Sequence, residues 1–329
     1  MIADLGIVLH HGIKNGEELS QYARLAEDAR FSSLWLTERY FHEETFSVLG
    51  YIAAVTKNIK LGVGVVNPFT RNLALLGMAA ATLDRISGGR FILGLGRSER
   101  SVIEDKMGIS YDGASSTLRN SVKVLRNILS RQGFIKDDEF FNLKDINLSI
   151  RPIQTQIPIY LSAIGPMALR SAGSIADGAI LNAYVSTDYV IYAVNEIKKA
   201  AVKAGKDPNT ITIACMLVIR PTENPVQMYA KLKRRIVQLL NEPHVGEILL
   251  DKGRFDPSIL NPLRSRFKQG AFEEAESLIS NEIVDSLYLV GSMSYCREKI
   301  EEYIEAGVNQ PLLLPSLSDF PLVAKLINR

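Results

Sequence analysis

Short runs of apolar, often β-branched residues alternate along the chain with longer stretches in which apolar residues recur every three or four positions. The short runs are almost continuously apolar, which is typical of strands buried on both faces of a parallel sheet. The pattern predicts eight strands, at residues 5–9, 34–37, 61–66, 91–95, 157–162, 178–181, 211–219 and 311–314. It also predicts amphipathic helices, at residues 17–29, 73–86, 116–129, 167–176, 193–204 and 297–306.

Strand-then-helix units repeated along 329 residues favour a single (β/α)8 TIM barrel over residues 1–329. A doubly wound open sheet is the alternative, but no segment rich in Pro, Gly or Ser divides the chain into two halves. Two segments, 96–114 and 223–285, are longer than a barrel unit requires. Both follow strands, so we expect them on the carboxyl-terminal face, where barrel active sites form. The helical insertion at 223–285 forms either a lid or substrate wall, or a peripheral decoration.

Composition and charge exclude several classes of protein. Lys and Arg total 38 against 36 Asp and Glu, a formal charge of +2, so we expect no nucleic-acid partner. No apolar run reaches the roughly 18 residues that span a bilayer, so we expect a cytoplasmic protein without membrane contact. Cys215 and Cys296 form no CxxC pair and no other metal-ligand spacing occurs, so we expect no metal site.

Polar residues that follow the predicted strands are candidates for chemistry. Glu38 and Arg39 follow the second strand, and they form either an ion pair or polar groups that face the substrate. Glu99 follows the fourth strand and is a candidate general acid or base if it is partly desolvated. His10 and His11 end the first strand with side chains on opposite sides, so one of them can face the barrel mouth; a pair of turn histidines is the alternative.

Small residues near the strand ends are candidates for ligand contact. The run Ser162-Ala163-Ile164-Gly165 follows the fifth strand and opens a helix, so its free N–H groups predict an anion site; a plain turn is the alternative. Asn182 follows the next strand and could line the same pocket. Gly94-Leu-Gly96 and Gly62-Val-Gly64 are too short for a dinucleotide fingerprint, and we interpret them as places where the backbone approaches a planar ligand.

Several segments together resemble the luciferase-like superfamily. They are Leu61-Gly-Val-Gly-Val-Val-Asn67-Pro-Phe-Thr-Arg71, Ala81-Thr-Leu-Asp84-Arg-Ile-Ser87-Gly-Gly-Arg90-Phe-Ile-Leu-Gly94-Leu-Gly96, Ala172-Gly-Ser-Ile-Ala-Asp177-Gly178, and Val290-Gly-Ser292 followed by Glu305-Ala-Gly307. The run from Asn67 to Arg71 is most similar to the branch that depends on coenzyme F420, such as the methylenetetrahydromethanopterin reductases.

This resemblance implies a barrel that binds F420 or a flavin at the carboxyl ends of its strands. It implies an oxidoreductase that transfers a hydride between the deazaflavin C5 and a small organic substrate, and a homodimer. It further implies a non-prolyl cis peptide at Gly64–Val65 against the cofactor ring, a phosphate site at Ser162–Gly165, and an acidic group at Glu99. We therefore expect cofactor contacts from Gly64, Val65, Asn67, Gly96, Ser162, Ala163, Ile164, Gly165 and Asn182, and catalytic roles for Glu99, Glu38 and Arg39.

One position departs from the pattern of the branch. Several F420 enzymes carry Asp-His where this chain has Glu38-Arg39, and an arginine does not release its proton at working pH. Arg39 would then stabilise an anionic reduced ring or bind an acidic substrate. The alternative functions are an FMN-dependent monooxygenase supplied with reduced FMN by a partner flavin reductase, and a flavin-binding barrel without catalysis.

Overall fold

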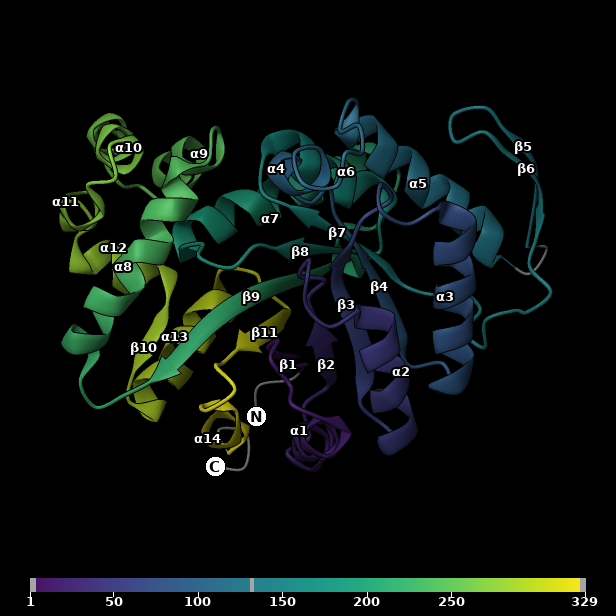
Figure 1. Ribbon diagram of the computed structural model, residues 1–329, viewed down its shortest axis with the longest axis horizontal. Coiled ribbons are helices and arrows are strands. Elements are labelled where there is room, and N and C mark those ends of the chain that lie inside the picture. The colour runs from purple at the N-terminus through teal and green to yellow at the C-terminus, as the bar shows by residue number, and fades with distance from the viewer. Residues whose placement is uncertain (1–3, 131–132, 326–329) are drawn as a thin grey trace.

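Eight parallel strands close into a barrel in the computed structural model of the chain, which describes residues 4–130 and 133–325 (Figure 1). The strands, in barrel order, are β1 (Gly6–Leu9), β2 (Ser33–Leu36), β3 (Lys60–Val66), β4 (Phe91–Leu95), β7 (Ile159–Ala163), β8 (Gly178–Leu181), β9 (Thr212–Pro221) and β11 (Gln310–Leu314). Strand β11 pairs with β1, and β8 pairs with β9, which completes the ring. This confirms the predicted TIM barrel and excludes the open sheet; each barrel strand overlaps a predicted one, with bounds that differ by at most a residue or two.

Helices surround the barrel on its outside (Figure 1). They are α1 (Gly16–Asp28), α2 (Thr45–Val55), α3 (Leu73–Ile86), α5 (Ala114–Leu129), α6 (Pro166–Ile175), α7 (Thr187–Lys203), α13 (Met293–Glu305) and α14 (Phe320–Ala324). Helix α3 has the predicted bounds, whereas α2 was not predicted. The pattern also missed an antiparallel hairpin, β5 (Phe134–Asp138) with β6 (Leu143–Asn147), and a short strand, β10 (Leu289–Gly291), that pairs with the end of β9.

Two segments add helices after strand ends. A short helix, α4 (Arg100–Ile103), follows β4. The segment after β9 contains α8 (Pro225–Asn241), α9 (Val245–Lys252), α10 (Leu260–Lys268), α11 (Phe272–Ser277) and α12 (Asn281–Leu287). Helices α8 to α12 stack together on one side of the barrel, at the left of Figure 1.

Gly62 of β3 and Gly94 of β4 leave room for other atoms of the barrel core. Trp35 of β2 is fully buried inside the barrel, and a Cβ atom added at Gly62 would lie 2.3 Å from its indole ring. A Cβ atom at Gly94 would lie 2.1 Å from the main-chain oxygen of Val63. The interpretation that these two glycines admit a planar ligand is therefore wrong, because protein atoms occupy the space beside them.

The Ser87-Gly-Gly-Arg90 motif lies at the amino-terminal end of the barrel, directly before β4. The Arg90 guanidinium donates hydrogen bonds to the main-chain oxygens of Ala53, Thr56 and Ile59 at 2.7–3.1 Å. Its Nε donates to the oxygen of Ser87 at 2.6 Å. The side chain thus joins the end of α2, the start of β3 and the turn before β4, which is a stabilising role away from the carboxyl ends of the strands.

Candidate active site

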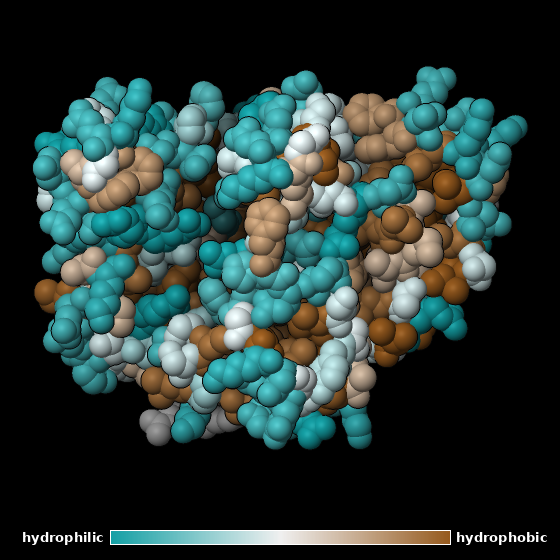
Figure 2. Space-filling view, in the orientation of Figure 1, coloured by the Kyte–Doolittle hydropathy of each residue, from teal (hydrophilic) through white to brown (hydrophobic). Residues whose placement is uncertain are grey.

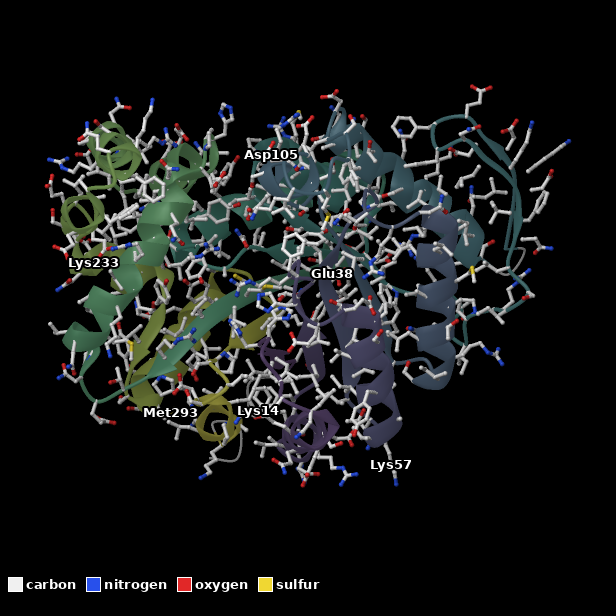
Figure 3. The ribbon with its side chains drawn as sticks, in the orientation of Figure 1. Lys14, Glu38, Lys57, Asp105, Lys233 and Met293 are labelled. Carbon is white, nitrogen blue, oxygen red and sulfur yellow. The ribbon has the colours of Figure 1, made fainter. Side chains whose placement is uncertain are left out.

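The predicted site residues come together at the carboxyl ends of the strands. Glu38 and Arg39 follow β2, Asn67 follows β3, and Glu99 follows β4. The other candidates end or follow β7 and β8, the next two strands of the barrel after β4: Ser162, Ala163, Ile164, Gly165 and Asn182. Figure 3 shows Glu38 near the middle of the molecule, whereas Lys57, beyond the carboxyl end of α2, lies at its edge.

Glu38 pairs with Arg71 rather than with Arg39. Its Oε1 lies 2.5 Å from Nη2 of Arg71, and the same nitrogen lies 2.5 Å from Oε1 of Glu44. Burial lowers the pKa of Arg71, but the hydrogen bonds and charges of Glu38 and Glu44 outweigh burial and raise it. The Arg71 guanidinium also lies over the Phe46 ring, 5.1 Å from its centroid. Arg39 is exposed and makes no ion pair with Glu38, so of the two alternatives for this pair of residues the ion pair is wrong.

Asn67 shapes the turn that carries Arg71. It is only 2% exposed, and its Oδ1 accepts hydrogen bonds from the N–H groups of Phe69 and Thr70 at 2.9 and 3.0 Å. Its Nδ2 donates to the hydroxyl of Tyr40, whose pKa is raised by burial. The side chain therefore fixes this turn against the loop after β2.

Gly64 and Val65 form a local irregularity of β3 at the mouth. The peptide bond between them is cis, as the family resemblance implied. The register of β3 against β4 shifts between Val63 and Val66. A Cβ atom at Gly96 would lie 2.4 Å from Cγ2 of Val65, so Gly96 gives Val65 the room it occupies.

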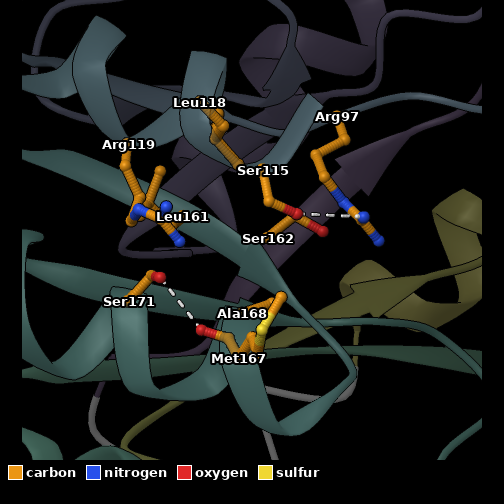
Figure 4. Close-up of a pocket in the computed structure, with 9 residues that line it drawn as sticks. All are labelled: Arg97, Ser115, Leu118, Arg119, Leu161, Ser162, Met167, Ala168 and Ser171. Atoms are coloured by element: carbon orange, nitrogen blue, oxygen red, sulfur yellow. Dashed lines mark hydrogen bonds between the residues drawn. The ribbon is translucent and has the colours of Figure 1, made fainter. Parts of the chain in front are cut away.

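A basic depression lies where β4, β7 and the start of α6 meet (Figure 4). Arg97, Arg119, Ser115 and Ser162 line it, with the first turn of α6. Its volume is about 20 Å³, which is room for one water molecule while both arginine side chains stay in place. Both arginines are exposed, so they are free to adopt other rotamers around an anion. The combination of guanidinium groups, hydroxyls and a helix N-terminus suits a phosphate group.

The helical segment after β9 reaches this part of the mouth. Ile248 of α9 lies 3.6 Å from the position of a Cβ atom at Gly165. Arg235 of α8 lies over the ring of Tyr184, which follows β8, at 5.7 Å from its centroid. Helices α8 and α9 therefore stand as a wall beside the β7 and β8 ends.

Glu99 and Asn182 are both exposed. Glu99 is the residue before α4, and its side chain does not cap that helix. The desolvation that would tune a general acid or base is thus absent at Glu99 in this arrangement.

A second cavity, which sequence reasoning did not find, lies between the ends of β1 and β2 and the starts of α1 and α2. Its volume is about 180 Å³, and its walls are mostly apolar, from Ile13, Leu19, Leu36 and Val48. Its polar wall includes His11, Thr37 and Glu43. The sequence places His10 and His11 at the end of the first predicted strand, but nothing in the spacing of Thr37 and Glu43 predicts that both contact His11.

His11 is held at both ring nitrogens. Its Nε2 lies 2.9 Å from Oγ1 of Thr37, and its Nδ1 lies 3.3 Å from Oε2 of Glu43. The other carboxylate oxygen of Glu43 accepts the N–H groups of Gly12 and Ile13, both at 3.0 Å. Burial lowers the pKa of His11, although Glu43 opposes that shift.

Within residues 4–130 and 133–325 no three His, Cys, Asp or Glu side chains are grouped to hold a metal ion. None of the helices in those ranges has the length and apolar character needed to cross a bilayer.

Comparisons with known proteins agree with this geometry. The 5,10-methylenetetrahydromethanopterin reductase of Methanolobus tindarius is 30% identical over 294 residues, 89% of this chain and 88% of that protein. The crystal structure of the F420-dependent tetrahydromethanopterin reductase of Methanopyrus kandleri superposes with a TM-score of 0.82, at 26% identity over 98% of this chain and 97% of the other. A type II Baeyer–Villiger monooxygenase of Pseudomonas putida in complex with FMN shares the fold, with a TM-score of 0.71 at 17% identity over 99% of this chain and 98% of the other. Residues 4–310 match the family of luciferase-like monooxygenases. The chain therefore belongs to the luciferase-like family of oxidoreductases, as its motifs predict.

Proposed function

We propose that the protein is an F420-dependent oxidoreductase that transfers a hydride between the deazaflavin C5 and a small organic substrate. The observation that carries this proposal is the basic depression beside the barrel mouth, because F420 joins a planar ring to an anionic phosphodiester tail. Relatives whose names state a dependence on F420, among them the Methanopyrus kandleri reductase at 26% identity, favour F420 over FMN. The bound cofactor would supply the hydride acceptor or donor, and the protein would supply binding, orientation and proton transfer.

The residues at the mouth fit such a group. Arg97, Arg119 and Ser162, with the first turn of α6, would hold the phosphodiester. Gly64, Val65 and Gly96 would support the ring, and Asn182 would contact it from β8. We retain Glu99 as a candidate acid or base that becomes desolvated only when ligand covers it, and Glu38 as the group that fixes Arg71.

Fluorescence titration under anaerobic conditions tests the proposal, with F420, oxidised FMN and reduced FMN added separately. We expect saturable binding of F420 at micromolar concentration or tighter. Replacing Arg97 and Arg119 together (Arg97→Met, Arg119→Met) should weaken F420 binding by about 10²-fold or more, because each charge-assisted hydrogen bond contributes about 1.5–3 kcal/mol and about 1.4 kcal/mol is a factor of ten. Arg24→Met removes an exposed arginine of α1 and should change nothing.

The other outcomes identify the alternatives. Preference for reduced FMN with oxygen consumption would overturn the proposal in favour of a monooxygenase with a partner flavin reductase. Binding of F420 without turnover of any hydride donor or acceptor would favour a non-catalytic barrel. Reduction of methylenetetrahydromethanopterin is the finer activity that the Methanolobus relative suggests, and it belongs in the first substrate panel.

We also propose that the chain forms a homodimer through α2 and α3. Leu75, Met78 and Ile86 are 60%, 48% and 57% exposed and lie along one face of α3. Tyr51 of α2 is 42% exposed, and a Cβ atom added at Gly50 of α2 would lie 3.8 Å from Cδ1 of Ile86, so α2 and α3 are adjacent there. Figure 2 shows apolar side chains gathered over the region of α2 and α3. Contiguous apolar surface of this kind is typical of a protein interface.

A further inference from the structure

The cavity between β1, β2, α1 and α2 has the size and lining of a binding site for a small neutral molecule. An apolar protein cavity of roughly 150 Å³ holds a benzene molecule, and this one measures about 180 Å³. Ile13, Leu19, Leu36 and Val48 form its aliphatic wall, and the other lining residues are polar or ionisable: His10, His11, Asn15, Thr37, Glu43 and Thr45. It lies at the carboxyl ends of β1 and β2, next to the β3 irregularity at Gly64–Val65.

The hydrogen bonds around His11 define its protonation state. Burial raises the pKa of Glu43, but the hydrogen bonds from Gly12 and His11 outweigh it and keep the pKa below the usual range, so Glu43 is ionised and only accepts hydrogen bonds. Nδ1 of His11 must therefore carry the proton that Glu43 accepts. Since the ring is 7% exposed and its pKa is lowered by burial, Nε2 is free of a proton and accepts the hydroxyl of Thr37.

Charged and polar groups surround the His11 ring, and together they favour the state in which Nδ1 carries the proton and Nε2 does not. Glu43 favours the imidazolium, whereas His42, with its ring centroid 5.2 Å away, and His10, at 6.1 Å, disfavour it. Thr37, from the end of β2, contributes no charge. The result is a basic nitrogen with a hydroxyl in front of it and a carboxylate behind it, the arrangement of a general base.

We propose that Thr37 and His11 transfer the proton of a neutral alcohol or carbonyl substrate whose apolar part occupies the adjoining cavity. This inference rests on the proposed function, because the hydride goes to or comes from the deazaflavin. In the oxidation direction the C–H and O–H bonds of the alcohol break and a C=O bond forms. The bound cofactor would supply the hydride acceptor, while the hydroxyl proton passes to Thr37 and the proton of Thr37 passes to Nε2 of His11. Carbonyl reduction runs through the same steps in reverse.

The substrate class follows from the chemistry of the relay. A hydride added to a carbonyl carbon leaves negative charge on oxygen, and that oxygen needs a proton. Glu43 holds the His11 ring in one tautomer and stabilises the imidazolium, so it is a positioning residue. A carboxylate on the substrate would meet Glu43 without a counter-charge, which selects for neutral compounds.

NMR of the ring nitrogens tests the His11 assignment in the protein without any cofactor. In ¹⁵N-histidine-labelled protein we expect His11 as the Nδ1–H tautomer at neutral pH, with a pKa below the usual range. In Glu43→Gln the amide N–H₂ group can donate to Nδ1, so the tautomer should change to Nε2–H. A His11 that titrates normally, or that keeps one tautomer in both proteins, would overturn the relay.

Ligand-observed NMR tests the cavity with cyclohexanone as the probe and cyclohexanecarboxylate as its charged counterpart. Cyclohexanone should bind saturably and at least tenfold more tightly than the carboxylate. Val48→Phe fills the cavity and should weaken cyclohexanone binding tenfold or more. Val202→Phe, at a 61% exposed position of α7, should leave it unchanged. Equal binding of both probes, or binding indifferent to Val48→Phe, would refute the site.

Turnover of cyclohexanol with F420 tests the proton transfer itself. His11→Asn should lower kcat by about 10²-fold or more, with little change in KM, and should remove the acid limb of the kcat profile. Thr37→Val should lower kcat similarly, whereas Arg24→Met, at an exposed position of α1, should not. A His11→Asn enzyme with unchanged kcat, or F420 binding without cyclohexanol turnover, would overturn the inference. Failure to bind F420 at all would instead reject the proposed function, and the two NMR experiments would still decide the cavity and the tautomer.

Discussion

At the scale of single residues, close packing of side chains inside the barrel decides which side chains a position such as Gly62 can hold. Trp35 fills the interior, donates its indole N–H to Ser33 at 2.9 Å and lies 5.8 Å from the ring of Tyr160. Its ring can lie flat on β3 only because Gly62 has no side chain. The requirement at Gly62 is therefore for space and not for ligand contact.

Gly62→Ala should destabilise the protein by about 3 kcal/mol, because the new methyl group would overlap the Trp35 ring in a closely packed interior. Chemical denaturation measures the loss as a lower midpoint at an unchanged slope. Gly50→Ala is the matched control in helix α2, where the nearest neighbour of the new Cβ is 3.8 Å away. It should stabilise by up to about 1 kcal/mol, since alanine favours the helix. Equal effects of the two changes would contradict the role of Trp35.

At the scale of elements, the hydrophobic periodicity of the sequence predicted amphipathic helices and missed a helix that is not amphipathic, α2. The eight barrel strands were readable because each is a short apolar run between turn signals. Helix α2 was missed because its sequence, TFSVLGYIAAV, is apolar on most faces and has no 3.6-residue contrast. The Glu38–Arg71 and Glu43–His11 pairs join residues 33 and 32 positions apart, so loop geometry decides them and no local pattern reports it.

An ion pair between elements of the helical segment after β9 has a defined pH dependence. Arg264 of α10 bonds both carboxylate oxygens of Glu247 in α9, at 2.5 and 3.1 Å, and the main-chain oxygens of Leu240 and Glu242 at the end of α8. The hydrogen bond from Arg264 lowers the pKa of Glu247 to about 2. Because the pKa of Glu247 is lower in the folded state, the ion pair stabilises the folded protein fully at any pH above the ordinary glutamate pKa. This stabilisation is lost as the pH falls from that value towards 2.

Glu247→Gln should therefore reduce stability at pH 7 by no more than about 1 kcal/mol, because the Glu247 side chain is 47% exposed and solvent screens the pair. The difference from the wild type should shrink between pH 5 and pH 3. Thermal unfolding of both proteins across that range measures it. A difference that grows as the pH falls would contradict the assigned pair.

At the scale of the whole molecule, the two ends of the barrel have separate tasks. The Ser87-Gly-Gly-Arg90 motif identifies the family, yet Arg90 only joins main-chain segments at the amino-terminal end. The groups suited to chemistry are at the other end, on the loops that follow the barrel strands. The sequence therefore sufficed for the family and the barrel, whereas the contacts of His11 with Thr37 and Glu43 became visible only when β1 and β2 were placed side by side.

The outer surface of α2 and α3 is the place where the proposed dimer can be tested. Replacing two exposed apolar side chains together, Leu75→Glu with Met78→Glu, places four carboxylates across a twofold interface, since each subunit contributes two. Like charges in a desolvated contact repel strongly, so sedimentation velocity should show a dimer for the wild type and a monomer for the double variant. Val226→Glu, at a 65% exposed position of α8, should remain dimeric. A wild-type chain that sediments as a monomer at all concentrations would reject this interface, and a double variant that remains a dimer would move it to another face.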